Sequence, residues 1–498
     1  MDQLNPPQRP NLISFDSSAT VVSTSQLLDS NFDLESQSNP QEPKSNKLDD
    51  FTTHDNESIL TFIGEDETTD KKHSENTMYL DNVEDFPDGG LKAYLVVFGS
   101  FMGLIPCFGI FNILGVIESY VNEHQLSSVD SSIVGWIFSI FSFITYTTCI
   151  FSGTYFDRNG AKFPIVIGSI LVCSGLVATA SSTQVWHFIC SFSLLTALGN
   201  GLLMSPLVSV VSHYFLKKRA MFSSIATLGG SFGGVIFPIL LRELFPKIGY
   251  EWSMRVFALI CGFCLIFPII LCKERINNSK SHEMESWKHK TITYLSSFDY
   301  KSFKEPKFLF NSLGALFAEI STVSLLTFFA SYVLQKGFTT NDTYSLVTVI
   351  NAGTIPGRFI SGYLADKLGR YNVIIFTIAM TGVVNLTIWM PFGSSLSVLY
   401  AYAIIYGIFS GSIFSLVPVC IGQISKTEEF GKKYSTMYFI IAFGTLFGVP
   451  IGGAIIGDKS IDNYNWFIVY ASISAFLGSI CYGISRFYCV GWKVLTKF

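Results

Sequence analysis

Charged residues are scarce in this chain. Asp, Glu, Lys and Arg make up 14% of its 498 residues, against about 25% in an average soluble domain. Apolar residues make up 49%, and the mean hydropathy is +0.42. The scarcity begins after residue 88, because residues 1–88 alone hold 19 acids and 5 bases. A body so poor in charge disfavours a soluble enzyme and a nucleic-acid-binding protein.

Residue patterns typical of metal, redox or catalytic sites are missing as well. The ten cysteines lie in or beside apolar stretches, and the one C-x-x-C pair, Cys261 and Cys264, has neither a second pair nor histidines nearby. Small buried hydrophobic residues explain these cysteines better than metal or redox chemistry does. The sequence also shows no paired carboxylates, no nucleophile beside a base and no phosphate-binding loop. We therefore expect no enzyme activity, no metal site and no cofactor.

Long apolar stretches dominate the chain after residue 88. A helix needs about 20 mostly apolar residues to cross the hydrocarbon of a bilayer. The stretches are continuously apolar rather than alternating, which favours helices over the strands of a barrel. The sequence predicts an all-α membrane protein with twelve transmembrane helices in two six-helix halves. The predicted spans are 92–117, 133–154, 163–182, 186–212, 220–241, 253–272, 307–333, 343–364, 372–392, 395–421, 434–456 and 465–486.

Composition divides the chain into five parts. We predict a disordered acidic cytosolic tail at 1–88, an N-terminal six-helix half at 89–272, a cytosolic linker at 273–306, a C-terminal six-helix half at 307–486 and a cytosolic tail at 487–498. Twenty Lys and Arg lie in the segments on one side of the bilayer and four in those on the other. This excess places both termini in the cytosol. We expect the plasma membrane, with the vacuolar membrane as the alternative.

A short pattern occurs twice in the body. Each copy has a Gly, an Asp four residues later and a Gly three residues after the Asp, with bases beside them. The copies follow the second and eighth spans and lie 209 residues apart, so the halves are parallel repeats. The candidate gating residues are Gly153, Asp157, Arg158 and Gly160 in the first copy, and Gly362, Asp366, Lys367, Gly369 and Arg370 in the second.

The spacing of this pattern suits a mechanical role. The Asp can accept hydrogen bonds from a helix N-terminus across the bundle, and the bases can bond the carbonyls at helix C-termini. We expect such contacts to latch one face of the protein shut. The alternative is a tight loop with ordinary charges.

The repeated pattern resembles the signature loop of the major facilitator superfamily, and the resemblance extends over residues 89–490. Asp88-Gly89-Gly90 before the first span and the segment 214–220 entering the fifth resemble the monocarboxylate porter family. The segment 351–358, Asn-Ala-Gly-Thr-Ile-Pro-Gly-Arg, resembles the fungal branch of that family, which includes a riboflavin permease. The resemblance implies a secondary carrier of a small-molecule substrate that works by alternating access.

Ionisable groups near the centres of spans are the candidate substrate contacts, because a charge there is costly unless it is paired or wetted. Glu319 lies midway along span seven. Arg358 in span eight follows Pro356 and Gly357, which we expect to loosen the helix towards a water-filled cavity. In the family that the chain resembles, the arginine at this place binds the substrate carboxylate. The alternative is a structural ion pair between Arg358 and Glu319.

Proton coupling of the usual kind is not expected. Proton-coupled members of the family carry an acid one turn before this arginine and a lysine in the first span. The matching positions here are Thr354 and Asn112, which cannot exchange a proton near pH 7. This departure favours facilitated diffusion, with Glu319 as the alternative proton site.

Amides and aromatic residues extend the candidate site. Asn112, Asn351 and Asn200 carry amides that would be costly facing lipid, so we expect them to face inwards as further substrate contacts. Tyr402 and Tyr406 fall on one face of span ten. They form either a stacking wall for a planar ring such as a flavin, or ordinary helix packing.

The remaining charged groups are expected to face water. Arg219, Arg242 and Arg255 lie near span ends, where long side chains snorkel to the interface. The lysines of the tail, set among acids and hydroxyls, are candidate sites for modification or sorting machinery, with a solvated linker as the alternative.

These observations favour a carrier of a small organic solute with a planar or anionic part, such as a riboflavin-like compound, moved by facilitated diffusion. The alternatives are a proton-coupled monocarboxylate transporter and a non-transporting nutrient sensor that signals through the acidic tail.

Overall fold

The computed structural model describes residues 81, 85–275, 297–457, 460–493 and 496–498, and throughout these ranges the long elements are helices. The first half holds α2 (Leu91–Glu123), α3 (Ser131–Asn159), α4 (Lys162–Ala180), α5 (Val185–Phe188), η2 (Ile189–Thr196), α6 (Ala197–Ser212) and α7 (Arg219–Leu271). The short η3 (Ser302–Lys304) precedes the second half. That half holds α10 (Pro306–Gln335), α11 (Thr340–Leu368), α12 (Arg370–Val384), η4 (Asn385–Trp389), α13 (Met390–Phe392), α14 (Leu396–Gln423), η5 (Thr427–Glu429), α15 (Phe430–Ile456) and α16 (Ile461–Val490).

Ten helices within the described ranges are long and apolar enough to cross a membrane. One of them, α7, has 53 residues and is two spans in one, because Gly249 inside it takes a φ of 73° that breaks the helical path. The helix α11 is as long as a span but falls outside the ten, since polar residues such as Asn351, Arg358 and Asp366 lie along it. The predicted all-α, twelve-helix fold is confirmed.

Two spans are not uniform α-helices. The fourth span runs through α5, η2 and α6, and the ninth runs through α12, η4 and α13. The segments η2 and η4 are π-helical, so each adds a residue to its turn and shifts the faces of the helix on either side.

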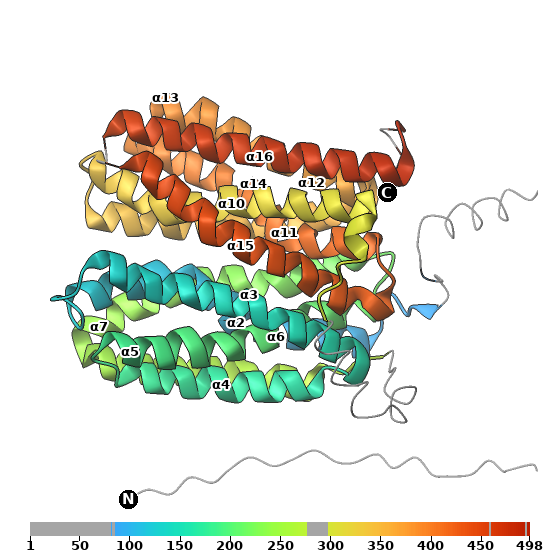
Figure 1. Cartoon of the computed structure of the whole chain (residues 1–498), viewed down its shortest axis with the longest axis horizontal. Coiled ribbons are helices and arrows are strands. Elements are labelled where there is room, and N and C mark those ends of the chain that lie inside the picture. The colour runs from blue at the N-terminus through green and yellow to red at the C-terminus, as the bar shows by residue number, and fades with distance from the viewer. Residues whose placement is uncertain (1–80, 82–84, 276–296, 458–459, 494–495) are drawn as a thin grey trace, which may run out of the picture. The chain divides into compact units, whose positions relative to one another are not determined.

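The helices form two groups. Figure 1 shows α2 to α7 below α10 to α16, with α3 and α15 meeting between the groups. Within the first group α2 packs on α7 and α4 packs on α6, while in the second α10 packs on α16 and α11 on α14. The two groups meet along two seams, α7 with α11 and α3 with α15. Both seams pair helices from opposite halves.

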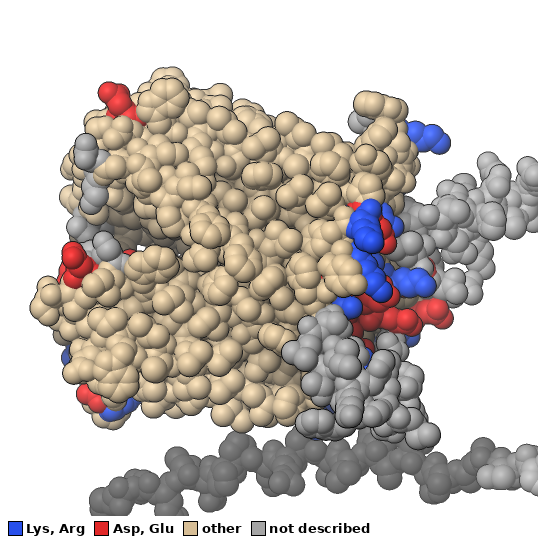
Figure 2. All heavy atoms as spheres, viewed as in Figure 1, with Lys and Arg blue, Asp and Glu red and all other residues tan. Residues whose placement is uncertain are grey.

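The sides of the bundle are apolar. On the face shown in Figure 2, charged side chains gather at the two ends and the surface between them carries none. Large apolar side chains such as Leu259, Ile270 and Phe447 are exposed on the helices, as expected for a protein surrounded by hydrocarbon. We call the end that carries Lys217, Arg219, Arg370 and Lys432 the basic end.

The predicted tail and linker lie mostly outside the described residues, because the structure does not describe 1–80 of the tail and 276–296 of the linker. At the end of the tail, Asp88 accepts hydrogen bonds from the backbone N–H groups of Leu216 at 2.8 Å and Lys217 at 3.0 Å. At the other end of the chain the helix runs further than predicted. The helix α16 ends at Val490 rather than at 486, because the four residues after Arg486 are apolar and continue it.

The packing of α4 against α6 gives a test of the fold. A Cβ at Gly199 would lie 2.6 Å from the backbone nitrogen of Val172 and 2.7 Å from the carbonyl oxygen of Gly168. Because both neighbours are backbone atoms, we expect Gly199→Ala to destabilise the protein by about 1–3 kcal/mol. The measurement is the melting temperature of the detergent-solubilised protein. Gly483→Ala is the matched control, since a Cβ there meets nothing within 4 Å; equal melting temperatures for the two variants would contradict this packing.

Candidate functional site

Asp157 joins the two halves at the basic end of the α3–α15 seam. It lies in the last turn of α3, and the backbone N–H groups of Gly431 and Lys432 in the first turn of α15 donate to its carboxylate at 2.9 Å and 2.7 Å. These N–H groups have no partner inside their own helix, and the N-terminus of a helix carries partial positive charge. Four residues earlier, a Cβ at Gly153 would overlap the carbonyl group of Gly431. The glycine therefore allows the approach that the Asp completes.

Asp366 makes the same contact in the other seam. It lies near the end of α11, and the N–H groups of Ala220 and Met221 in the first turn of α7 donate to it at 3.1 Å and 2.8 Å. A Cβ at Gly362 would lie 2.9 Å from the carbonyl oxygen of Ala220. Each half thus offers a carboxylate to a helix N-terminus of the other half.

Two arginines extend these contacts. Arg370 is buried and donates to the carbonyl oxygen of Leu216 in the other half and to the side chain of Gln423. Arg219 is 1% exposed, so the prediction that it snorkels to water is wrong. Its guanidinium reaches across to the carbonyl oxygen of Gly422 at 2.7 Å and the hydroxyl of Thr427 at 2.8 Å. The end of the fifth span abuts the other half rather than the solvent.

The other members of the repeated pattern have different surroundings. Lys367 is exposed and lies over the ring of Tyr363 at 4.4 Å. Arg158 is half-buried at the end of α3. Gly160 and Gly369 end α3 and α11 with φ values of 89° and 98°.

Asp81, a residue of the tail, also lies between the halves. Its carboxylate accepts hydrogen bonds from the hydroxyl of Thr427 at 2.6 Å and from the backbone N–H of Thr427 at 3.2 Å, and it lies 3.9 Å from Arg219. Nothing in the sequence distinguishes Asp81 from the other acids of the tail. Its contact adds a third carboxylate to the closed basic end.

Arg358 lies deeper in the α7–α11 seam. It is 3% exposed, and its guanidinium donates to the carbonyl oxygen of Thr227 in α7 and lies 5.2 Å from the ring of Phe414. One turn further, the hydroxyls of Thr354 and Ser231 are 2.7 Å apart. Arg358 is thus covered by protein in this conformation, because the seam is closed at this level.

The helix around Arg358 is also more regular than expected. We predicted that Pro356 and Gly357 loosen it, but α11 is continuous from Thr340 to Leu368. A Cβ at Gly357 would overlap the carbonyl group of Ile408, so this glycine serves the close packing of α14 on α11. The prediction was wrong because the neighbouring helix, rather than a cavity, occupies the space that the missing side chain leaves.

Glu319 lies in α10 and is 1% exposed. Neither carboxylate oxygen has a hydrogen-bond partner among the described residues. It interacts electrostatically with Arg358, yet no ion pair within 4.0 Å joins the two in the described part of the chain. The predicted structural ion pair is therefore not formed in this conformation, and Glu319 keeps its hydrogen-bonding capacity.

Two tyrosines that the sequence does not single out face each other near Glu319. Tyr146 in α3 and Tyr438 in α15 have ring centroids 5.4 Å apart, and Phe111 in α2 stacks on Tyr146 at 5.4 Å. Both rings lie within range of the carboxyl group of Glu319. A signal was available, because Tyr146 precedes Gly153 by seven residues and Tyr438 follows Gly431 by seven, which is two helical turns inward from the same contact.

The three candidate amides do not all reach one place. Asn112 and Asn351 come together around Gly234, where a Cβ would lie 2.8 Å from one amide and 3.0 Å from the other. Asn200 is instead buried within the first half, where its amide donates to the carbonyl oxygen of Cys107 at 3.1 Å and ties α6 to α2.

Tyr402 and Tyr406 lie apart from the seams. Their rings stack at 5.5 Å inside the second half, and the hydroxyl of Tyr402 donates to the side chain of Asn385 at 2.9 Å. Trp389 and Phe329 pack against Tyr402, and neither tyrosine is exposed. Ordinary helix packing accounts for their shared face.

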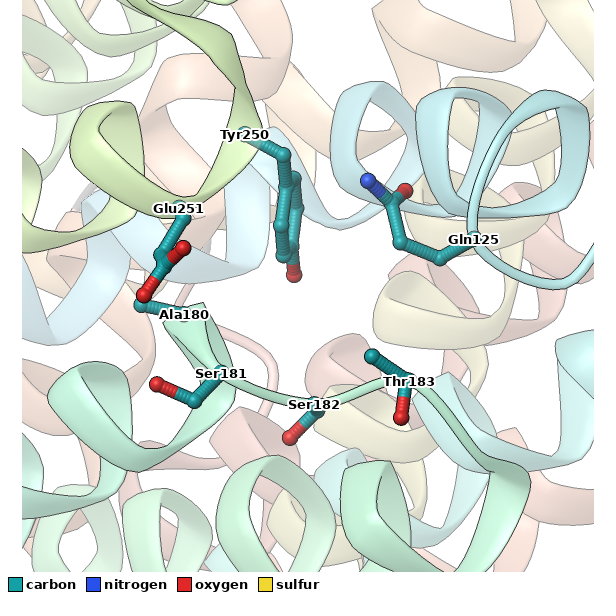
Figure 3. Close-up of a pocket in the computed structure, with 7 residues that line it drawn as sticks. All are labelled: Gln125, Ala180, Ser181, Ser182, Thr183, Tyr250 and Glu251. Atoms are coloured by element: carbon teal, nitrogen blue, oxygen red, sulfur yellow. The ribbon is translucent and has the colours of Figure 1, made fainter.

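A pocket of about 260 Å³ lies at the end opposite to the basic end, within the first half. Figure 3 shows the hydroxyl of Tyr250 pointing into the space between Gln125 and the segment 181–183. None of the predicted site residues lines it. Among the described residues there is also no group of three or more His, Cys, Asp or Glu that could hold a metal ion.

Comparisons with known proteins identify the relatives of the chain. It matches the Major Facilitator Superfamily over residues 93–363 and 312–487. It is 48% identical over 437 residues to the riboflavin transporter MCH5 of Saccharomyces cerevisiae, and the match covers 85% of this chain and 83% of the relative. It is 30% identical over 411 residues to the MFS-type transporter opdF of Penicillium oxalicum, with 82% and 94% covered.

A solved structure supports the fold. The human organic anion transporter MFSD10 superimposes with a TM-score of 0.61 over 80% of this chain and 100% of that one, at 15% identity. At this identity the likeness shows the fold alone. The matches together confirm the superfamily and the fungal relatives that the sequence motifs predict.

The contacts of the two aspartates predict a change in accessibility. Cys149 is buried in the α3–α15 seam, 3.7 Å from Ser435. Replacing both carboxylates, Asp157→Ala with Asp366→Ala, removes four charge-assisted hydrogen bonds, so we expect N-ethylmaleimide to modify Cys149 about tenfold faster or more. Mass spectrometry of the Cys149 peptide measures the rate. Glu243→Ala, which removes an exposed ion pair with Lys247 at the opposite end, is the control. An unchanged rate in the double variant would contradict the latch.

The basic end also predicts a pH dependence of stability. Burial and the nearby Arg219 and Arg275 lower the pKa of His213 to about 3, whereas the pKa of an unfolded histidine is about 6.5. The unfolded state therefore binds more protons between these values, and stability falls as the pH is lowered from 6.5. We expect the melting temperature to drop less between pH 7 and pH 4.5 in His213→Phe, whose ring keeps the contact with Phe156. An identical drop would contradict the buried neutral histidine.

Proposed function

Because this chain belongs to the major facilitator superfamily and is a secondary membrane transporter, we propose that its cargo is riboflavin or a similar planar solute. The similarity to the yeast riboflavin transporter extends over most of both chains, so it does not rest on one motif. The cargo class agrees with the expectation from the motif at 351–358.

The observation that carries this proposal is the polar group buried at the interface of the halves. Arg358 from α11 and Glu319 from α10 are both buried, Arg358 within the α7–α11 seam, and both keep unused hydrogen-bonding capacity. An unpaired charge at this depth is costly, and a substrate that bonds both groups offsets that cost. The site contacts that we propose are Arg358, Glu319, Tyr146 and Tyr438, with Asn112 and Asn351 further along the α7–α11 seam.

Transport proceeds by alternating access. The carboxylates of Asp157 and Asp366 and the guanidinium groups of Arg219 and Arg370 hold the basic end closed, while Figure 2 shows a hollow between the halves at the opposite end. The positive-inside rule places the basic end, and with it both termini, in the cytosol. The conformation is then the one that opens outwards, in the plasma membrane or, as the alternative, in the vacuolar membrane.

Facilitated diffusion suits the groups that surround the site. The amide of Asn112 donates to the carbonyl oxygens of Phe108 and Gly230. The hydroxyl of Thr354 donates to the backbone carbonyl oxygen of Asn351. These side chains do not titrate near pH 7, so they offer no proton relay. Glu319 is the one group of the proposed site that a proton-coupled mechanism would use.

Uptake by proteoliposomes tests the proposal. We expect labelled riboflavin to enter without a proton gradient, and Arg358→Ala to lower its uptake by about tenfold or more, because the lost bonds involve a charged donor. Arg255→Ala is the control, since that guanidinium stacks on Trp252 at the opposite end. Uptake of lactate or pyruvate driven by a proton gradient, with no uptake of riboflavin, would replace the flavin by a monocarboxylate as the cargo.

A further inference from the structure

We infer that the site recognises an imide edge on a flat heterocycle, that is, an N–H between two carbonyl groups, bonded by Glu319 and Arg358 while the ring lies between Tyr146 and Tyr438. The inference rests on the proposed function and adds the chemistry by which the cargo is selected. It also separates heterocycles that carry this edge from planar rings that lack it.

The hydrogen-bonding groups of the site are complementary to such an edge. An ionised Glu only accepts hydrogen bonds and an Arg only donates them. Both oxygens of Glu319 and the Nε of Arg358 have no partner among the described residues. A ligand that satisfies both must present a donor to Glu319 and an acceptor to Arg358, and an imide carries both. A carboxylate presents acceptors alone, so it leaves at least one oxygen of Glu319 without a donor.

The aromatic residues give the ligand its shape. Tyr146 belongs to the first half and Tyr438 to the second, and their rings are in contact across the seam. When the halves separate, each tyrosine exposes a ring face, and a flat ligand can stack on both. Phe111 supports Tyr146 from behind at 5.4 Å, and Tyr434 supports Tyr438 at 4.8 Å. Stacking of this kind adds to the attraction that comes from the buried area alone.

Riboflavin carries both features. The pyrimidine ring of its isoalloxazine has an N3–H flanked by the C2 and C4 carbonyl groups. The N3–H suits Glu319, a neighbouring carbonyl suits Arg358, and the three fused rings extend between the tyrosines. Since the tyrosines come from opposite halves, the ligand touches both halves at once, and its binding is thereby coupled to their rocking.

A methyl group on one nitrogen tests this arrangement without any change to the protein. The assay is counterflow of labelled riboflavin into proteoliposomes that hold the full chain, with riboflavin, 3-methylriboflavin and lumichrome as competitors. In 3-methylriboflavin the donor is gone, so we expect it to compete about tenfold more weakly than riboflavin, or worse. Lumichrome keeps the imide and the rings but lacks the ribityl chain, and we expect it to compete.

Variants assign the selectivity to the named residues. In Glu319→Ala the ratio between riboflavin and 3-methylriboflavin should fall to near one, because the group that reads the N–H is missing. This ratio is measured within one variant and does not depend on how much protein folds. Tyr146→Leu and Tyr438→Leu remove the aromatic rings and should weaken competition by both flavins to a similar extent.

The outcomes separate this inference from the function on which it rests. Equal competition by riboflavin and 3-methylriboflavin in the unaltered protein overturns the imide contact and leaves riboflavin transport standing. An unchanged ratio in Glu319→Ala overturns the role of that carboxylate. If no flavin is taken up, the proposed cargo fails, and the imide contact fails with it.

Discussion

The structure depends on the capping of a helix in one half by a carboxylate of the other. Asp157 binds the N-terminus of α15 and Asp366 binds the N-terminus of α7. Hydrophobic burial cannot hold the halves together inside a bilayer, because lipid is as apolar as their side chains. Hydrogen bonds to unpaired helix N–H groups, and glycines that let the backbones approach, supply the attraction instead. They also break cleanly, since water at the membrane surface can replace them.

Further inward, the same two seams hold residues of the proposed site. Along α11 the residues at positions 366, 362, 358 and 354 face α7 at intervals of one turn. A movement that parts Asp366 from α7 therefore also moves Arg358 away from Thr227. Asp366 and Arg358 lie on one continuous helix, so ligand binding at the proposed site and closure at the basic end would be mechanically linked.

The sequence predicts the spans well, because an apolar run of about 20 residues has few alternatives in a membrane. It also predicts the two aspartates, since their pattern is repeated. It does not predict which faces meet. The helices are apolar all round, so periodicity could not show that Tyr146 and Tyr438 face each other, whereas Tyr402 and Tyr406 turn inwards within one half. The exposure of Arg219 was predicted wrongly for a related reason. Its position near the end of a span does not show whether water or the other half covers that end.

The two contacts between a carboxylate and a helix N-terminus are related by symmetry. The carboxylates lie 209 residues apart and the N–H groups that they cap lie 211 apart, so the donor and the acceptor exchange roles between the halves. Such reciprocity is the property of an isologous dimer, in which one patch binds its own copy. A single six-helix subunit bearing one aspartate and one free helix end would form both bonds on pairing with itself, before any fusion of the two copies into one chain.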